Sequence, residues 1–278
     1  MLTPETIREI QALAISSRAE NLKTDFPFAI LPDGQGKASL HGLEAFHKLR
    51  NRFRGTYRTN SIRDFVKYVV SRGGSPRGFI DAEKVEALSC SVLFNLGDES
   101  APGHADDVAI LKPKSLAAFD AVRNVNGQKM TQQQAIDWIE DWSSVLMATG
   151  ADGYMGLPAA IAGIRHMKLL QKGEKASSVD NMSASRSAME EIEARSATVM
   201  PTHLTVTTQP FDGFPRRAFL LRIGVLTGST DNGITLVLRW QQAESQCEEI
   251  AQEFKSLLCA ELEGLADSIV VGTFDAGK

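Results

Sequence analysis

Basic side chains gather in one short segment. Residues 46–77 contain nine Lys or Arg and one acid, Asp64, which gives the segment a net charge of +8. The sequence from 50 to 58, RNRFRGTYR, alternates like a β-strand and would place its arginines on one face. Guanidinium groups in a row suit phosphates or carboxylates because each presents a planar fork of donors. The residues predicted to bind a polyanion or another subunit are Arg50, Arg52, Arg54, Arg58, Arg63, Lys67 and Tyr57.

The whole chain has a net charge of −4, so the residues outside 46–77 carry −12. Residues 241–267 hold seven acids against Lys255 and contribute −6 of that charge. Two interpretations stay open. The arginines pair with the acidic C-terminal segment, within one chain or across a subunit contact. Alternatively they bind an external polyanion such as nucleic acid, although a dedicated nucleic-acid-binding domain is usually basic overall.

A second cluster of polar side chains lies between 98 and 107. Asp98, Glu99, His104, Asp106 and Asp107 offer the carboxylates and imidazole that bind hard or borderline cations. No second histidine stands at ligand spacing, and acidic loops are ordinarily solvated. His104, Asp106 and Asp107 are therefore weak metal candidates. They carry the hypothesis of a metal-dependent hydrolase built on this loop.

No catalytic residue and no cofactor is predicted, because the sequence contains no Walker A, GxGxxG, GxSxG or HExxH motif. The question whether the protein is an enzyme stays open, with a non-enzymatic role favoured. Three widely spaced cysteines suit a reducing compartment better than a disulfide framework. No apolar run has the roughly 18 residues of a membrane span, and the polar N-terminus is unlike a signal peptide. We therefore expect a cytoplasmic protein that does not enter a membrane.

The periodicity of apolar residues predicts both helices and strands. Helix signals include Thr3 before Pro4, Ser61 with Asp64, and Thr131 with Gln134. Predicted helices begin at 3, 61, 115 and 131 and cover 158–170 and 242–262. Predicted strands cover 50–58, 85–96, 108–112, 203–208, 216–226, 234–240 and 268–274, and residues 31–42 read as a loop. The stretch 183–194 suits either a short helix or a polar edge strand.

These elements predict an α+β fold, mainly antiparallel sheets with flanking amphipathic helices. The chain is expected to form a single domain over 1–278, or two halves. In the second case 1–170 is helix-rich with a small sheet, and 171–278 is an antiparallel sheet with a long C-terminal helix. The strand at 216–226 is expected to be central because both of its faces are largely apolar.

Several blocks occur in an order that resembles the YfdQ-like family of phage and prophage proteins. They are RFRGTYRTNSIRDFVKYVVSRG, PGHADDVAILKP, QAIDWIEDW, MPTHLTVTTQPFDGF and RRAFLLRIG followed by ITLVLRWQQAE. The resemblance spans residues 45–272, and residues 171–196 depart from it. It implies a gene carried by temperate phages, often near recombination or early genes. It implies no catalytic residue, because the family has no established activity.

Together these observations predict a phage- or prophage-derived accessory protein of the bacterial host cytoplasm that acts by binding. We expect a homo-oligomer, with a host protein or nucleic acid as possible partner and a role in counter-defence or phage DNA metabolism. The first alternative is a nucleic-acid-binding protein that uses the basic segment 46–77. The second is the metal-dependent hydrolase on the 98–107 loop.

Overall fold

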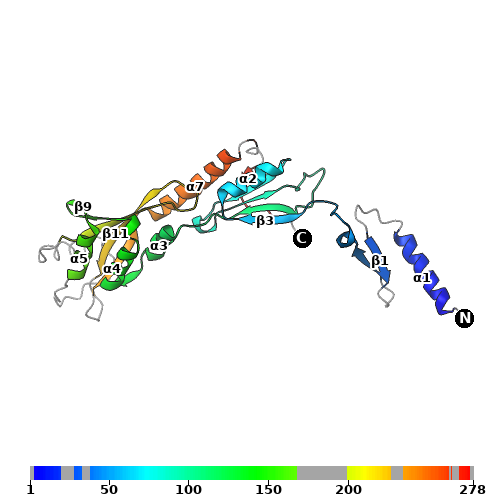
Figure 1. Cartoon of the computed structure of the whole chain (residues 1–278), viewed down its shortest axis with the longest axis horizontal. Coiled ribbons are helices and arrows are strands. Elements are labelled where there is room, and N and C mark those ends of the chain that lie inside the picture. The colour runs from blue at the N-terminus through cyan, green and yellow to red at the C-terminus, as the bar shows by residue number, and fades with distance from the viewer. Residues whose placement is uncertain are drawn as a thin grey trace. The chain divides into compact units, whose positions relative to one another are not determined.

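The computed structural model describes residues 3–19, 28–32, 38–167, 199–226, 234–262, 264 and 269–275 (Figure 1). The chain divides into two compact units, Met1–Gly55 and Thr56–Lys278. The expected α+β class is confirmed, since helices alternate with mostly antiparallel sheets.

The first unit contains a helix and a small hairpin. Helix α1 (Pro4–Ala19) begins where the sequence predicts, and the Thr6 N–H donates to Oγ1 of Thr3 at 3.3 Å. Strands β1 (Phe28–Pro32) and β2 (Ala38–Gly42) pair antiparallel, and the short 3₁₀ helix η1 (Glu44–Phe46) follows. The expectation of a loop was therefore wrong at 31–32 and 38–42, and residues 33–37 lie outside the described residues. Pro32 and Gly42 stand at the ends of the two strands, where neither interrupts the pairing.

The larger of the two sheets in the second unit has the strand order β7-β12-β11-β10-β8-β9. All of its recorded pairings are antiparallel, and β11 lies between β12 and β10, which confirms its predicted central position. Strands from both sides of residue 170 share this sheet. Its strands are β7 (Lys129–Thr131), β8 (Leu146–Gly150), β9 (Gly153–Met155), β10 (Pro201–Thr208), β11 (Arg217–Leu226) and β12 (Thr235–Trp240).

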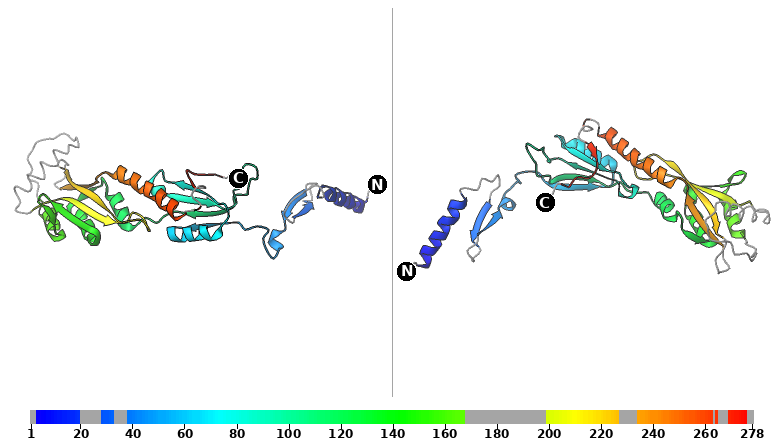
Figure 2. Two further views of the ribbon diagram at one scale, coloured as in Figure 1. Left: turned by 90° about the horizontal axis from the view of Figure 1, so that it is seen from above. Right: turned by 180° about the vertical axis from the view of Figure 1, so that it is seen from behind.

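Three helices pack against this sheet: α3 (Ala117–Val125), α4 (Gln132–Asp141) and α5 (Leu157–His166) (Figure 2). The N-terminus of α4 forms the predicted capping box. The Thr131 hydroxyl accepts from the Gln134 N–H at 3.2 Å, and the Gln134 amide oxygen accepts from the Thr131 N–H at 2.9 Å. Alternate residues of the strands and the apolar stripes of the helices fill one core around Phe119, Leu204 and Leu221.

The second sheet has the order β13-β4-β5-β6-β3. Its edge strand β13 runs parallel to β4, and the pairs β4–β5 and β5–β6 are antiparallel. Its strands are β3 (Gly55–Thr59), β4 (Arg77–Asp81), β5 (Ser89–Leu93), β6 (Asp107–Leu111) and β13 (Ile269–Val271). Three helical elements contribute side chains to the same buried cluster as this sheet. They are helix α2 (Ile62–Arg72), the 3₁₀ helix η2 (Val85–Ala87) and helix α7 (Ala243–Glu261).

Several boundaries differ from the sequence predictions. The strand expected over 50–58 begins at Gly55, and the one expected over 85–96 is limited to Ser89–Leu93. Helix α5 ends at His166 rather than at 170. Val70 of α2 is 58% exposed, because Ile62, Phe65 and Val69 already fill the buried stripe of the helix. The stretch 183–194, for which the sequence suits either a helix or a strand, lies outside the described residues.

Candidate binding surfaces

The basic segment does not present a row of four arginines. Because the strand begins at Gly55, residues 50–54 lack the alternation on which that prediction depended. Arg54 instead forms an ion pair with Glu44 of η1. Burial acts to raise the pKa of Glu44. Hydrogen bonds from the Asn51 N–H and Arg54, with the charges of Arg54 and Arg50, outweigh that effect and lower the pKa.

Arg72, at the end of α2, has a structural partner in the adjacent sheet. Its guanidinium pairs with Asp107 at the start of β6, whose side chain is nearly buried, and it lies over the Phe94 ring at 5.3 Å. The pair fixes the end of the helix to the strand and gives a buried carboxylate its counter-charge.

Arg50 and Arg52 lie in the first unit, between η1 and β3. The other four candidates lie on β3 and α2. Tyr57 of β3 stacks on Tyr68 of α2, with ring centroids 4.3 Å apart. Side chains alternate along a strand, so exposed Arg58 points away from α2. Arg63 and Lys67 are exposed one turn apart on α2. The predicted single face of basic residues is therefore replaced by separate groups, and their role in binding stays a prediction.

Two acids of α7 form ion pairs with Arg217, which was not among the predicted binding residues. Arg217, at the start of β11, pairs with Glu253 at 2.6 Å and with Glu249 at 3.6 Å. Arg217 lies outside 46–77. These two acids therefore pair with an arginine that is not part of the basic segment. The sequence signal was weak, because a single arginine at a strand end resembles any solvent-exposed charge.

The acidic loop 98–107 is organised by its own hydrogen bonds. Asp98 accepts from the Ser100 hydroxyl and from the N–H groups of Ser100 and Ala101. The Ser100 hydroxyl is the largest cause of the lowered pKa of Asp98. Asp106 accepts from the Asn95 side chain at 2.8 Å, and His104 is exposed. In the part of the chain that the structure describes, no three His, Cys, Asp or Glu side chains come together as a metal site.

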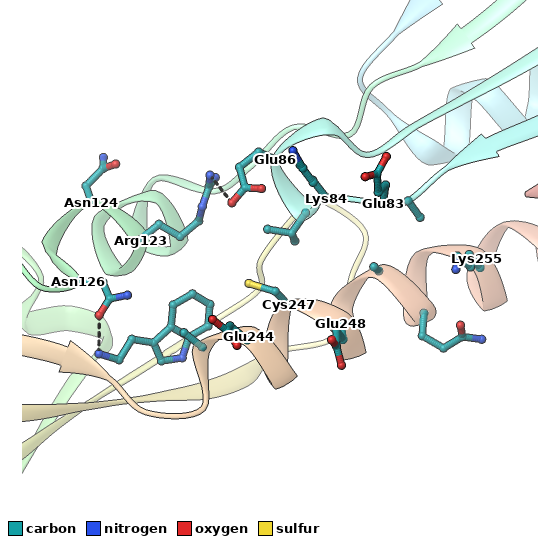
Figure 3. A pocket seen from close by; sticks show the side chains of 16 residues that line it. Glu83, Lys84, Glu86, Arg123, Asn124, Asn126, Glu244, Cys247, Glu248 and Lys255 are labelled. Carbon is teal, nitrogen blue, oxygen red and sulfur yellow. Dashed lines mark hydrogen bonds and ion pairs between the residues drawn. The ribbon is translucent and has the colours of Figure 1, made fainter. Parts of the chain in front are cut away.

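A groove of about 760 Å³ lies between η2, the end of α3 and the first half of α7 (Figure 3). Trp240 lines it; the Trp240 backbone N–H donates to Oδ1 of Asn126 and its ring Nε1 donates to Gln246, both at 2.9 Å. Charged side chains of both signs surround the groove. They are Glu83, Lys84, Glu86, Arg123, Glu244, Glu248 and Lys255.

An ion pair and one thiol lie among the side chains that line this groove. Arg123 of α3 and Glu86 of η2 form an ion pair at 3.0 Å on the side of the groove opposite α7 (Figure 3). Cys247 is its one thiol, and burial is the largest of the causes that raise the pKa of Cys247, so the thiol stays protonated. No histidine lines the groove to serve as its base. Sequence reasoning missed this groove because α7 lies more than a hundred residues along the chain from η2 and α3.

The fold and these surfaces define an α+β protein with two sheets, a mixed-charge groove and several separate basic groups. The chain belongs to the family described as "Uncharacterized conserved protein (DUF2303)", whose model matches residues 3–274. No curated protein matches the chain. No solved structure matches it either. Among the described helices, none has the length and apolar character needed to cross a membrane.

Proposed function

We propose that this protein is a phage- or prophage-derived accessory protein of the bacterial cytoplasm that acts by binding and self-associates through α1. The observation that carries the proposal is the apolar stripe of this helix. Ile7, Ile10 and Leu13 are 47%, 53% and 69% exposed. They recur at the spacing of one helical face, and exposed apolar patches of this kind mark protein–protein contacts.

A second copy of the chain is the partner that this helix fits best. Most of the stability of a helix in a protein comes from packing of its apolar face, so α1 gains stability when its stripe is covered. Further exposed apolar side chains occur in the same unit at Phe46, Leu49 and Phe53. The opposite charges of segments 46–77 and 241–267 favour contacts between copies as well. A host protein is the alternative occupant, and counter-defence or phage DNA metabolism is the setting that the family resemblance suggests.

Size-exclusion chromatography with light scattering tests the proposal. The wild type is expected at a multiple of the 30.3 kDa protomer mass at both low and high salt, because an apolar contact is not screened. The triple variant Ile7→Ser, Ile10→Ser, Leu13→Ser should elute as a monomer.

The matched control is Glu5→Ser, Arg8→Ser, Glu9→Ser, which lowers helix propensity to a similar extent but keeps the stripe. It should stay oligomeric. A wild type that is monomeric at every salt concentration would refute self-association. An oligomer that dissociates in high salt would assign the contact to the charged segments instead of α1.

A further inference from the structure

The sheet β13-β4-β5-β6-β3 has two unlike faces. On one, Asp107 pairs with Arg72 of α2, and Ile80, Cys90 and Leu111 are fully buried. Burial raises the pKa of Cys90, and the nearby Cys259 of α7 raises it further. Helix α7 therefore also approaches this face. The residues between these buried ones point to the other side of the sheet. There Phe79 of β4 is in register with Ser91 of β5, and Ser91 is in register with Ile110 of β6. These three are half-buried.

Three exposed cations occupy this second face. Arg58 alternates with Tyr57 on β3, Arg77 stands two residues before Phe79 on β4, and Lys112 stands two residues after Ile110 at the end of β6. None of the three forms an ion pair with another residue that the structure describes. The pKa of Asp98 is lowered mainly by the hydrogen bonds that it accepts from Ser100 and Ala101. The positive charge of nearby Arg77 makes a smaller contribution in the same direction.

An aromatic pair lies on the same face, at the β13–β4 edge of the sheet. Phe274 stacks on Phe79 with ring centroids 4.8 Å apart and an interplanar angle of 18°. The Gly272 N–H donates to the Ile80 carbonyl at 2.8 Å, which holds the chain ahead of Phe274 against the sheet. Phe274 is still 43% exposed, so its outer ring surface is available to a planar partner.

We propose that this open sheet face, defined by Arg58, Arg77, Phe79, Lys112 and Phe274, binds single-stranded nucleic acid. Cations on separate strands neutralise phosphates, and an exposed ring stacks on a base. Unpaired bases offer a π-face to that ring, whereas a duplex hides it. The proposal is independent of self-association through α1. It retains two residues of the basic segment, Arg58 and Arg77, and adds Lys112 and Phe274 from outside it.

Fluorescence anisotropy with labelled oligothymidylate and oligouridylate of about 16 nucleotides tests this at low salt with the full chain. Binding to at least one of the two is expected, and the tighter one identifies DNA or RNA as the natural class. For Arg58→Ala, Lys112→Ala, the slope of log K against log salt should fall in magnitude by about 1.4, because two phosphate contacts are lost. The control Arg63→Ala, Lys67→Ala removes two exposed cations from α2 and should keep the wild-type slope.

The aromatic contribution is measured separately. Phe274→Ala should weaken binding by about tenfold at every salt concentration, and Phe274→Tyr should bind like the wild type. The proposal is overturned if neither oligonucleotide binds at low salt, or if an unlabelled duplex competes as well as an unlabelled single strand. It is also overturned if both double variants reduce the slope of log K against log salt by the same amount. The same titration with Ile7→Ser, Ile10→Ser, Leu13→Ser should still show binding, so a failure of self-association and a failure of this site are distinguishable.

Discussion

Nη2 of Arg217 lies 2.6 Å from Oε2 of Glu253 and joins the start of β11 to the middle of α7. Both side chains are about three-quarters buried, at 20% and 26% exposure. The Nε of Arg217 is buried with no hydrogen-bond partner among the described residues. The position of this guanidinium therefore depends on the two glutamates of α7, and chiefly on Glu253.

The first prediction is that Glu253→Gln lowers the free energy of unfolding by about 1.5 kcal/mol, because the carboxylate that balances the charge of a largely buried guanidinium becomes a neutral amide. Glu249→Gln is the matched control. Its side chain is 65% exposed and 3.6 Å from Arg217, so its cost should stay below about 0.5 kcal/mol. Urea denaturation followed by tryptophan fluorescence measures both. Equal costs for the two variants would contradict the assignment.

A second prediction concerns the three thiols. Cys259 is exposed, Cys247 is half-buried and Cys90 is buried. Burial and the neighbouring Cys259 raise the pKa of Cys90 to about 12, so at pH 8 only about one Cys90 in ten thousand is a thiolate. With Ellman's reagent we expect a fast phase from Cys259, a slower one from Cys247, and no reaction of Cys90 before unfolding.

The variant Cys259→Ser should abolish the fast phase, and Cys247→Ser should abolish the slow one. Cys90 should then react at the rate of global unfolding, which a denaturant series measures independently. Rapid labelling of Cys90 in the native double variant would show that the face of the sheet beneath α2 is open to solvent.

Local signals predicted much of this fold. The capping box of Thr131 and Gln134 and the N-cap at Ser61 depend on residues within one helical turn, so the sequence contains all the required information. The apolar character on both faces of β11 likewise predicted its central position. These signals were sufficient for the α+β class and for most helix starts.

Long-range placement was not predictable in the same way. The residues of 50–58 alternate in the sequence, yet the strand begins at Gly55 and Arg54 pairs with Glu44 of η1. Strand β4 was not predicted because Gly78 stands on its buried side and Phe79 on the other, so its apolar side chains do not alternate. The contacts of Phe79 with Phe274 and of Arg217 with Glu253 join distant segments, and no spacing rule brings such pairs together.

The last prediction concerns pH. His203 on β10 pairs in register with Arg222 on β11, and its Nδ1 is 3.0 Å from the Thr202 hydroxyl. Burial, followed by the positive charge of Arg222, lowers the pKa of His203. The unfolded chain, with a histidine pKa of about 6.5, therefore takes up a proton before the folded chain does.

The sign follows from proton linkage. As the pH falls below about 6.5, His203 is protonated in the unfolded state before it is protonated in the folded state. The free energy of unfolding therefore falls over this range, and the contribution of His203 stops changing once both states are protonated. His203→Gln should reduce the loss of stability between neutral and mildly acidic pH. Its control is His104→Gln, at an exposed loop position, which should keep the wild-type dependence. Urea midpoints across this pH range measure the difference, and identical pH profiles for His203→Gln and the wild type would refute the role of His203.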